Sequence, residues 1–272
     1  MQTPPPLTDL TRLALNRDKA EPDAMFLHQE ALLELQDRIE MVNRTFTKPA
    51  IVTGFPDFWA EKIPNALIVP ESEVLDLKPQ AHDLVIHALS LHWANDPVGQ
   101  LVQCQRALVP DGFFIAALFG GQTLAGLRTA LAEAESQITG GLSPRVLPMG
   151  EIRDLGGLLQ RAGFALPVAD SSMRNVTYAD MFALMRDVRA MGEGNALASR
   201  NHAPANRRMF ERAAEIYAAQ NPAENGRVLA QFELMFLSGW APHESQQKPL
   251  RPGSAQMRLA DALGARDADV PD

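Results

Sequence analysis

The chain has 272 residues, of which 46% are hydrophobic and 21% are charged, which is typical of a folded globular protein with a sizeable core. Its formal net charge of −8 argues against a broad electrostatic surface for nucleic acid or anionic lipid, so the sequence predicts no nucleic-acid partner. The single cysteine, Cys104, excludes an internal disulfide and a cysteine-based zinc site.

The two ends of the sequence differ in composition from the part between them. The Pro-rich start and the final "ARDADVPD" predict mobile segments over 1–20 and 257–272, around one domain over 21–256. The start lacks the apolar core of a secretory signal, and no window reaches the roughly 18 continuous apolar residues of a membrane span. We therefore expect a cytoplasmic protein without a membrane span.

The first half of the chain predicts a helix followed by a parallel sheet. Helical spacing of apolar residues begins near Pro22 or Asp23 and continues to about residue 46. Apolar runs that start at 50, 66, 83 and 112 are typical of strands buried on both faces. Between the last two runs, Asp96 and Pro97 mark the start of a helix, as N-cap and first helical residue. A strand, a helix and a strand in this order indicate parallel pairing.

The second half is predicted to be mostly helical. Periodic segments predict helices over 122–138, 149–162, 178–191 and 204–220, and apolar runs at 163 and 228 predict two more strands. The strand at 228 is long enough to lie antiparallel beside the strand at 112. The interpretation is a single Rossmann-like α/β domain with a helical insertion over about 138–222.

The stretch "AIVTGFPDFW" occupies the turn after the first strand. In nucleotide-binding α/β domains this turn carries closely spaced glycines, which let the backbone approach the ligand, but here Gly54 stands alone. One interpretation is a strand end followed by an aromatic core plug, with Asp57 capping a short helix. The alternative is a modified pocket in which Phe55, Phe58 or Trp59 stacks on an adenine.

The distance along the chain between the first strand and the run at 83 is short. Three strands of about 5 residues and three crossovers of about 10 to 12 residues need roughly 45 to 50 residues. Ala50 and Asp83 are only 33 positions apart (83 − 50). The sheet is therefore predicted to lack about one strand and helix.

Several separated motifs resemble one protein family. "DLVIHALSLHWANDP", "LVPDGFFIAALFGG", "LGGLLQRAGF", "MGEGN" and "GWAPHESQ" are similar to class I S-adenosylmethionine-dependent methyltransferases. Within that superfamily they resemble the group of the mitochondrial complex I assembly factor with a methyltransferase-like domain and its bacterial homologues. That group lies near the malonyl-acyl-carrier-protein methyltransferase of biotin synthesis.

The resemblance implies S-adenosylmethionine as cofactor, and also a departure from the family pattern. Members that use it have an acidic, multi-glycine turn after strand one, which "VTGFPDF" replaces here. The resemblance places Glu71 or Ser72 near the adenine position. The cofactor-binding candidates are Gly54, Glu71, Ser72, Ser90 and Leu91.

Further candidates lie at the predicted carboxyl ends of strands, where open α/β sheets bind ligands. His92 is the candidate for catalysis or substrate positioning, because imidazole titrates near neutrality; its alternative is a structural role. Substrate or partner candidates are Trp93, Gly120, Gly121, Gly192, Glu193, Asn195 and His243. His82, His87 and His92 lack the spacing of a metal site, so no metal is predicted.

Two functions from different classes follow. The first is a methyltransferase-family protein with a degenerate cofactor turn. Such a protein either retains weak or altered S-adenosylmethionine-dependent transfer or is a pseudoenzyme. The second is a non-catalytic assembly factor that recognises a protein partner through residues 141–204 and the "HESQQKP" segment. Malonyl-thioester methylation ranks last, because it needs an intact cofactor site.

Overall fold

A computed structural model describes residues 5–60, 62–204 and 206–247. The regular elements in this part of the chain follow the order α1 (Leu10–Arg17), η1 (Pro22–Ala24), α2 (Phe26–Met41), β1 (Pro49–Thr53), α3 (Pro56–Trp59), β2 (Leu67–Pro70), β3 (His82–Ala88), η2 (Leu91–Trp93), α4 (Pro97–Ala107), β4 (Leu108–Phe119), α5 (Ala125–Thr139), α6 (Ile152–Arg161), β5 (Ala165–Tyr178), α7 (Met181–Ala190), α8 (Arg207–Gln220), η3 (Glu224–Gly226) and β6 (Val228–Trp240).

The six described strands form one sheet in the order β2-β1-β3-β4-β6-β5. Strands β1, β2, β3 and β4 are parallel, and β6 runs antiparallel between β4 and β5. This confirms the predicted Rossmann-like methyltransferase fold, including the antiparallel last strand beside the strand predicted at 112. The chain passes from β1 to β2 through only the four-residue helix α3, so the predicted shortening of the sheet is also confirmed.

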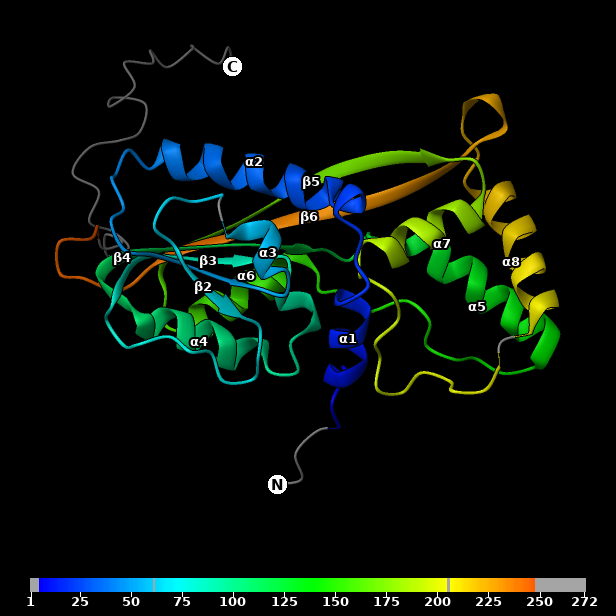
Figure 1. The fold of residues 1–272 in the computed structure, drawn as a ribbon, viewed down its shortest axis with the longest axis horizontal. Coiled ribbons are helices and arrows are strands. Elements are labelled where there is room, and N and C mark those ends of the chain that lie inside the picture. Colours follow the sequence, from blue (N-terminus) through cyan, green and yellow to red (C-terminus); the bar gives the residue numbers. More distant parts are fainter. Residues whose placement is uncertain (1–4, 61, 205, 248–272) are drawn as a thin grey trace, which may run out of the picture. The chain divides into compact units, whose positions relative to one another are not determined.

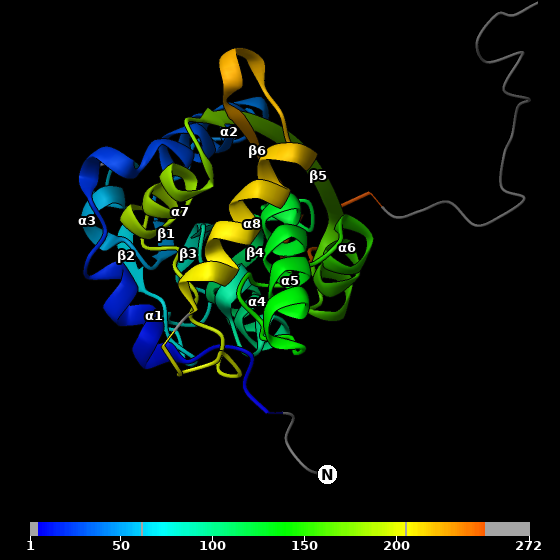
Figure 2. The same ribbon diagram turned by 90° about the vertical axis from the view of Figure 1, so that its right-hand side faces the viewer.

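Helices cover both faces of the sheet (Figure 1). One core contains Leu27 and Leu35 of α2 with Ile51 and Ile86 of the sheet, and continues to helices α5, α7 and α8. The second core contains Val52 and Val85 on the other face, packed against α4 and α6. Neighbouring strand residues divide between the two cores because successive side chains point to opposite faces. Figure 2 shows α5, α7 and α8 together at one end of the strands.

The helix after β1 begins differently from the prediction. Phe55, and not Asp57, is the N-cap residue of α3, and no side chain caps that helix. Pro56 takes the first helical position, which its fixed φ suits, so Asp57 already lies inside the first turn. The predicted cap at Asp96 of α4 is confirmed, because its Oδ1 accepts a hydrogen bond of 2.8 Å from the amide of Gly99.

Helix α1 lies in the segment predicted to be a mobile end. No helix was predicted there, because "LTRLALNR" spans only two turns and is too short for a clear helical periodicity. The side chain of Asp9 caps the helix by accepting from the amide of Arg12 at 3.0 Å. Motion over 1–20 is untested, and residues 257–272 lie outside the described part of the chain.

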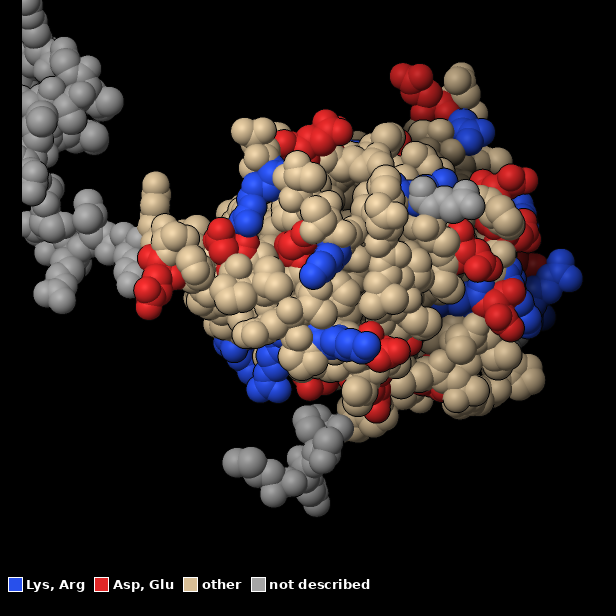
Figure 3. Space-filling model, turned by 60° about the vertical axis from the view of Figure 1, so that its left-hand side comes forward, with Lys and Arg blue, Asp and Glu red and all other residues tan. Residues whose placement is uncertain are grey.

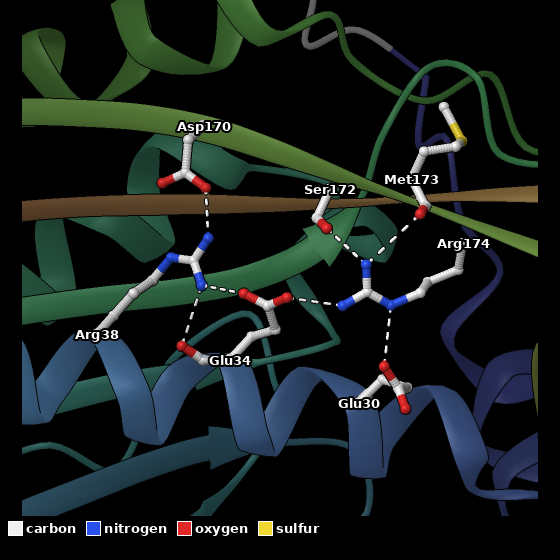
Figure 4. A network of polar contacts seen from close by, with 7 residues as sticks. All are labelled: Glu30, Glu34, Arg38, Asp170, Ser172, Met173 and Arg174. Atoms are coloured by element: carbon white, nitrogen blue, oxygen red, sulfur yellow. Dashed lines mark hydrogen bonds and ion pairs between the residues drawn. The ribbon is translucent and has the colours of Figure 1, made fainter.

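The range predicted as a helical insertion also contains β5. An ion-pair network joins this edge strand to α2 (Figure 4). Arg38 reaches Asp170 at 2.5 Å and also contacts Glu34, whose other oxygen lies 2.6 Å from Arg174. Arg174 lies 2.9 Å from Glu30 as well. The network fixes α2 along the outer strand and leaves its apolar face for the core.

The chain divides into two units after Pro242. The first holds the sheet and every helix named above. On the face shown in Figure 3, basic and acidic side chains are interspersed around an uncharged area. Among the described residues, no helix combines the length and apolarity needed to cross a bilayer.

Candidate functional site

The switch point of the sheet lies between β1 and β3, because β1 has β2 on one side and β3 on the other. Open α/β sheets bind their ligands outside the carboxyl ends of the strands at this point. Gly54 follows β1 here, and the guanidinium of Arg17 lies directly against it. A Cβ atom at residue 54 would lie only 1.0 Å from Nη1 of Arg17. We call the space occupied by this guanidinium, between Gly54, Phe55 and Glu71, the switch-point crevice.

Glu71 follows β2 and pairs with Arg17, Oε1 to Nη1, at 2.7 Å. Burial raises the pKa of Glu71 to about 7, against the opposing attraction of Arg17. The amide of Glu71 donates to the carbonyl of Thr53 at 2.9 Å, which fixes the carboxylate beside the end of β1. The predicted neighbour Ser72 instead uses its hydroxyl locally, donating to the carbonyl of Val74.

Aromatic side chains fill the space behind the Gly54 turn. Trp59 is fully buried, and its Nε1 donates to Nδ1 of His28 at 3.3 Å. His28 packs edge-on against Phe55, with ring centroids 4.5 Å apart, and against Phe58 at 5.4 Å. Burial lowers the pKa of His28 to about 3, so this imidazole is neutral near pH 7. The arrangement matches the core-plug interpretation of "VTGFPDFW".

A second buried histidine connects the carboxyl end of β3 to α4. His87 Nε2 lies 2.8 Å from Oε1 of Gln100, and its Nδ1 lies 3.3 Å from the hydroxyl of Ser90. The amide nitrogen of Gln100 donates to the carbonyl of Ser72 at 3.0 Å. Ser90 thus has a partner within the protein, and Leu91, buried among apolar residues, belongs to the core on the α4 side.

His92, Trp93 and Glu193 meet although 101 positions separate His92 from Glu193. Trp93 Nε1 donates to Oε2 of Glu193 at 2.6 Å, and His92 Nε2 lies 3.2 Å from the same oxygen. Burial raises the pKa of Glu193, but the attraction and hydrogen bond of His92, with Arg17 and Trp93, outweigh it and lower that pKa to about 2. Glu193 is therefore an ionised, buried carboxylate. Its Oε1 and the Nδ1 of His92 are buried without a hydrogen-bond partner among the described residues.

A cavity of about 1180 Å³ adjoins this cluster. Trp93, Glu193 and Phe119 contribute to its wall, together with α1, α5 and α7 and the segment around Leu147. The lining also includes Arg12, Lys19, Arg186 and Arg189, whose side chains form no ion pair or hydrogen bond within the described ranges. An apolar wall with unpaired cations suits an occupant that has both apolar and acidic groups.

The remaining candidates have close neighbours from the protein itself. A Cβ atom at Gly120 would meet Met235 at 2.5 Å, and one at Gly121 would meet Glu151 at 2.8 Å. Gly192, with φ +77, packs against the ring of Phe55. Asn195 donates to the carbonyl of Pro144 at 3.0 Å and lines the cavity. His243 contacts Ser245, Nδ1 to Oγ, at 2.7 Å within the second unit.

S-adenosylmethionine in the position that the resemblance implies would have to displace the side chain of Arg17. The Arg17 guanidinium already fills the space against Gly54, and Phe55 is buried next to it. No group of three or more His, Cys, Asp or Glu side chains in the described ranges is placed to hold a metal ion.

Two residues of this region, Arg17 and His28, are not among the candidates predicted from the sequence. Both lie on helices that precede the sheet, and no motif marks them. A signal for His28 was its place among the apolar residues of α2, where an unpaired polar side chain is costly.

Comparison with known proteins identifies the family. The chain is 38% identical over 222 residues to the mitochondrial arginine-hydroxylase NDUFAF5 of Danio rerio, covering 82% of this chain and 69% of that protein. It is 40% identical to the human protein of the same name, covering 74% of this chain and 58% of that protein. The chain belongs to the NDUFAF5 family. No family model matches it.

More distant relatives of this NDUFAF5 family member are methyltransferases. The malonyl-acyl-carrier-protein O-methyltransferase of Laribacter hongkongensis is 32% identical, covering 69% of this chain and 61% of that protein. Among solved structures, the YcgJ protein from a Bacillus species matches with a TM-score of 0.46 and 11% identity, covering 74% of this chain and 94% of that one.

Proposed function

We propose that this chain is an assembly factor of the respiratory complex I type, which binds a segment of a protein partner in the cavity beside Glu193. It works without S-adenosylmethionine at the switch-point crevice. The observation that carries this proposal is the contrast between two neighbouring spaces. Arg17 fills the crevice, whereas a cavity of about 1180 Å³ lies open to a ligand beyond Trp93 and Glu193.

The lining of the cavity favours a partner segment with acidic and apolar side chains. Four cations without a side-chain partner in the described part of the chain contribute to it: Arg12, Lys19, Arg186 and Arg189. The chain as a whole has a net charge of −8, so this cluster of positive side chains differs in sign from the net charge of the protein. Complementary charge raises the rate of encounter and selects the partner, while apolar contacts contribute most of the affinity.

A second candidate function is recognition of an arginine on the partner, which the name of the NDUFAF5 relatives suggests. Its support is Oε1 of Glu193, which has no hydrogen-bond partner among the described residues and belongs to an ionised carboxylate in the cavity wall. A guanidinium donates paired hydrogen bonds to carboxylates. Mass spectrometry of complex I subunits from cells with and without the chain tests this function, since a modified arginine changes the mass of its peptide.

The main proposal is tested by complementation. A strain that lacks the chain is expected to lose assembled complex I on native gels, and the wild-type chain to restore it. The double reversal Arg186→Glu with Arg189→Glu at the cavity is expected to abolish this rescue. The matched reversal Arg153→Glu with Arg161→Glu, at two exposed arginines of α6, is expected to preserve it.

Titration of the purified chain with S-adenosylmethionine and S-adenosylhomocysteine completes the test, after mass spectrometry shows that neither is bound. We expect no binding up to millimolar concentrations. Normal complex I in the deletion strain, or full rescue by the cavity variant, would refute the assembly role. Micromolar binding of the cofactor would instead refute the proposal that the chain works without S-adenosylmethionine.

The cytoplasmic location of the chain stays a prediction, which fractionation of the same cells checks.

A further inference from the structure

The side chain of Arg17 enters the switch-point crevice from outside the sheet. This side chain is 5% exposed, and Arg17 is the last residue of α1, which precedes the first strand. Nη1 lies so close to Gly54 that a side chain at position 54 would have to displace the guanidinium. The crevice therefore contains a ligand-like group that the chain itself supplies.

Three features of the crevice suit a guanidinium. Glu71 supplies a carboxylate at 2.7 Å, and the ring of Phe55 presents its face to the guanidinium carbon, 4.8 Å from the centroid. Gly54 removes the Cβ that would otherwise exclude the group. A carboxylate and an aromatic face are the two partners that stabilise this planar cation best. The site is thus built for the chemistry of its occupant.

The position of Phe55 is itself fixed from the other side. Gly192 has φ +77, and a Cβ atom there would lie 3.1 Å from Cε1 of Phe55. Because a left-handed φ favours glycine, the turn after α7 can pack directly on the ring. His28 contacts the same ring edge-on. These contacts hold the aromatic face in place under Arg17.

Helix α1 is attached to the loop after α7 by several hydrogen bonds. The amide of Asp9 donates to the carbonyl of Ala196 at 2.8 Å, and the carboxylate of Asp9 lies 2.8 Å from Arg200. Asn16, next to Arg17, donates to the carbonyl of Gly194 at 2.8 Å. Arg17 is therefore presented by an anchored helix, and little further ordering is needed to place it.

Charge and ring contacts hold the guanidinium more than hydrogen bonds do. Its three nitrogens have no hydrogen-bond partner among the described residues, so the contact with Glu71 is an ion pair without hydrogen-bond geometry. A buried charge that loses a partner of opposite charge is strongly destabilising, and Arg17 is attracted by both Glu71 and Glu193. Arg17 and Glu71 are accordingly interdependent.

We propose that the switch-point crevice is a guanidinium-binding site whose resident ligand is Arg17, in the position where an open α/β sheet ordinarily holds a diffusible cofactor. The chain itself thus supplies the group that lies at the carboxyl ends of β1 and β2. This inference goes beyond the assembly role and does not depend on any partner.

Chemical rescue tests the site. The variant Arg17→Ala keeps Cβ, and ethylguanidinium supplies the missing Cγ, Cδ and guanidinium atoms. We expect Arg17→Ala to have a lower Tm than the wild type, and millimolar ethylguanidinium to raise its Tm in a saturable manner, as a ligand that binds only the folded state does. Ethylammonium and sodium chloride at equal concentration are expected to have no such effect. Arg153→Ala, at an exposed arginine of α6, is the control variant, for which we expect neither a lower Tm nor a rescue.

A second pair of variants keeps the test decisive if Arg17→Ala does not fold. Gly54→Ala places a methyl group where the guanidinium lies, so it is expected to lower the Tm of the wild type. Gly157→Ala in α6, where no atom lies within 4 Å, is expected to leave the Tm unchanged or raise it. A Tm of Gly54→Ala equal to wild type, or the absence of rescue in a folded Arg17→Ala, would overturn the proposal.

Discussion

The indole nitrogen of Trp59 donates a hydrogen bond to Nδ1 of His28 across 3.3 Å and thereby joins the turn after β1 to helix α2. Trp59 is fully buried, and both residues belong to the packing behind Gly54. Because Nδ1 of His28 accepts this bond, its proton resides on Nε2, which has no partner in the described ranges. Trp59 therefore helps to hold the Gly54 turn, and with it the switch-point crevice, in place.

Removal of the Trp59 side chain tests this support. Trp59→Ala is expected to lower the free energy of unfolding by about 3–5 kcal/mol, because it opens a cavity in the core and leaves His28 without its donor. Phe182→Ala, at a side chain that is 37% exposed, is the control and should cost much less. Urea denaturation measures both. A loss below about 1 kcal/mol for Trp59→Ala would contradict the core-plug interpretation.

The two buried histidines predict acid sensitivity. Burial lowers the pKa of His28 to about 3 and that of His87 to about 4, both from 6.5. The unfolded chain then binds more protons than the folded chain below pH 6.5, so stability is lost as the pH falls through this range. At pH 5 each histidine contributes a loss of about 2 kcal/mol relative to pH 7.

Denaturation curves at pH 7 and pH 5 check this expectation. His28→Asn and His87→Asn are each expected to lower the free energy of unfolding at both pH values. Each should also reduce the difference in this free energy between pH 7 and pH 5 by about 2 kcal/mol. NMR titration of the wild-type imidazoles gives an independent measurement. An imidazole that titrates near 6.5 in the folded chain would contradict its burial as a neutral group.

Much of the fold was predictable because its signals are local. The apolar runs at 50, 66, 83 and 112 each coincide with most of one strand, although the strand predicted at 112 already begins at Leu108, and Asp96 caps α4 as predicted. The missing strand and helix between the first strand and the strand at 83 were predicted from the number of residues between them alone. The predicted N-cap of α3, Asp57, was wrong by two positions. Pro56 is the first helical residue, so the N-cap is Phe55.

The crevice was not predictable in the same way. The ion pair of Arg17 and Glu71 joins α1 to the end of β2, and nothing in "LTRLALNR" indicates a buried cation. His92 and Glu193 were both candidates from the sequence, but their contact spans 101 positions and depends on how α7 packs. Long-range polar pairs of this kind follow from tertiary packing, which periodicity does not report.

Glu71 predicts a pH effect of opposite sign to that of the histidines. Burial raises its pKa from 4.5 to about 7, so the folded chain holds this proton more tightly than the unfolded chain. The stability that it contributes is present below pH 4.5 and is lost as the pH rises to 7. In NMR spectra with labelled glutamate, one side-chain carboxyl should titrate near pH 7 and vanish in Glu71→Gln.

The attraction of Arg17 lowers the pKa of Glu71, so the variant Arg17→Met should move this titration to higher pH. Methionine keeps most of the apolar stem but carries no charge. An unchanged midpoint would show that the guanidinium does not act on this carboxylate, in conflict with the ion pair at 2.7 Å.

The caps of α3 and α4 give a matched pair of aspartates. Asp96 accepts from the amide of Gly99 at 2.8 Å and is the N-cap of α4, whereas Asp57 lies within the first turn of α3 and makes no cap hydrogen bond. Asp96→Ala is expected to lower the free energy of unfolding by about 1 kcal/mol, because a first-turn amide loses its acceptor. Asp57→Ala should lose only the smaller attraction to the helix dipole, about 0.3–1 kcal/mol at low salt, and nearly nothing at high salt. Denaturation in 1 M sodium chloride therefore separates the two variants, and equal losses there would contradict the assignment of Phe55 as the cap of α3.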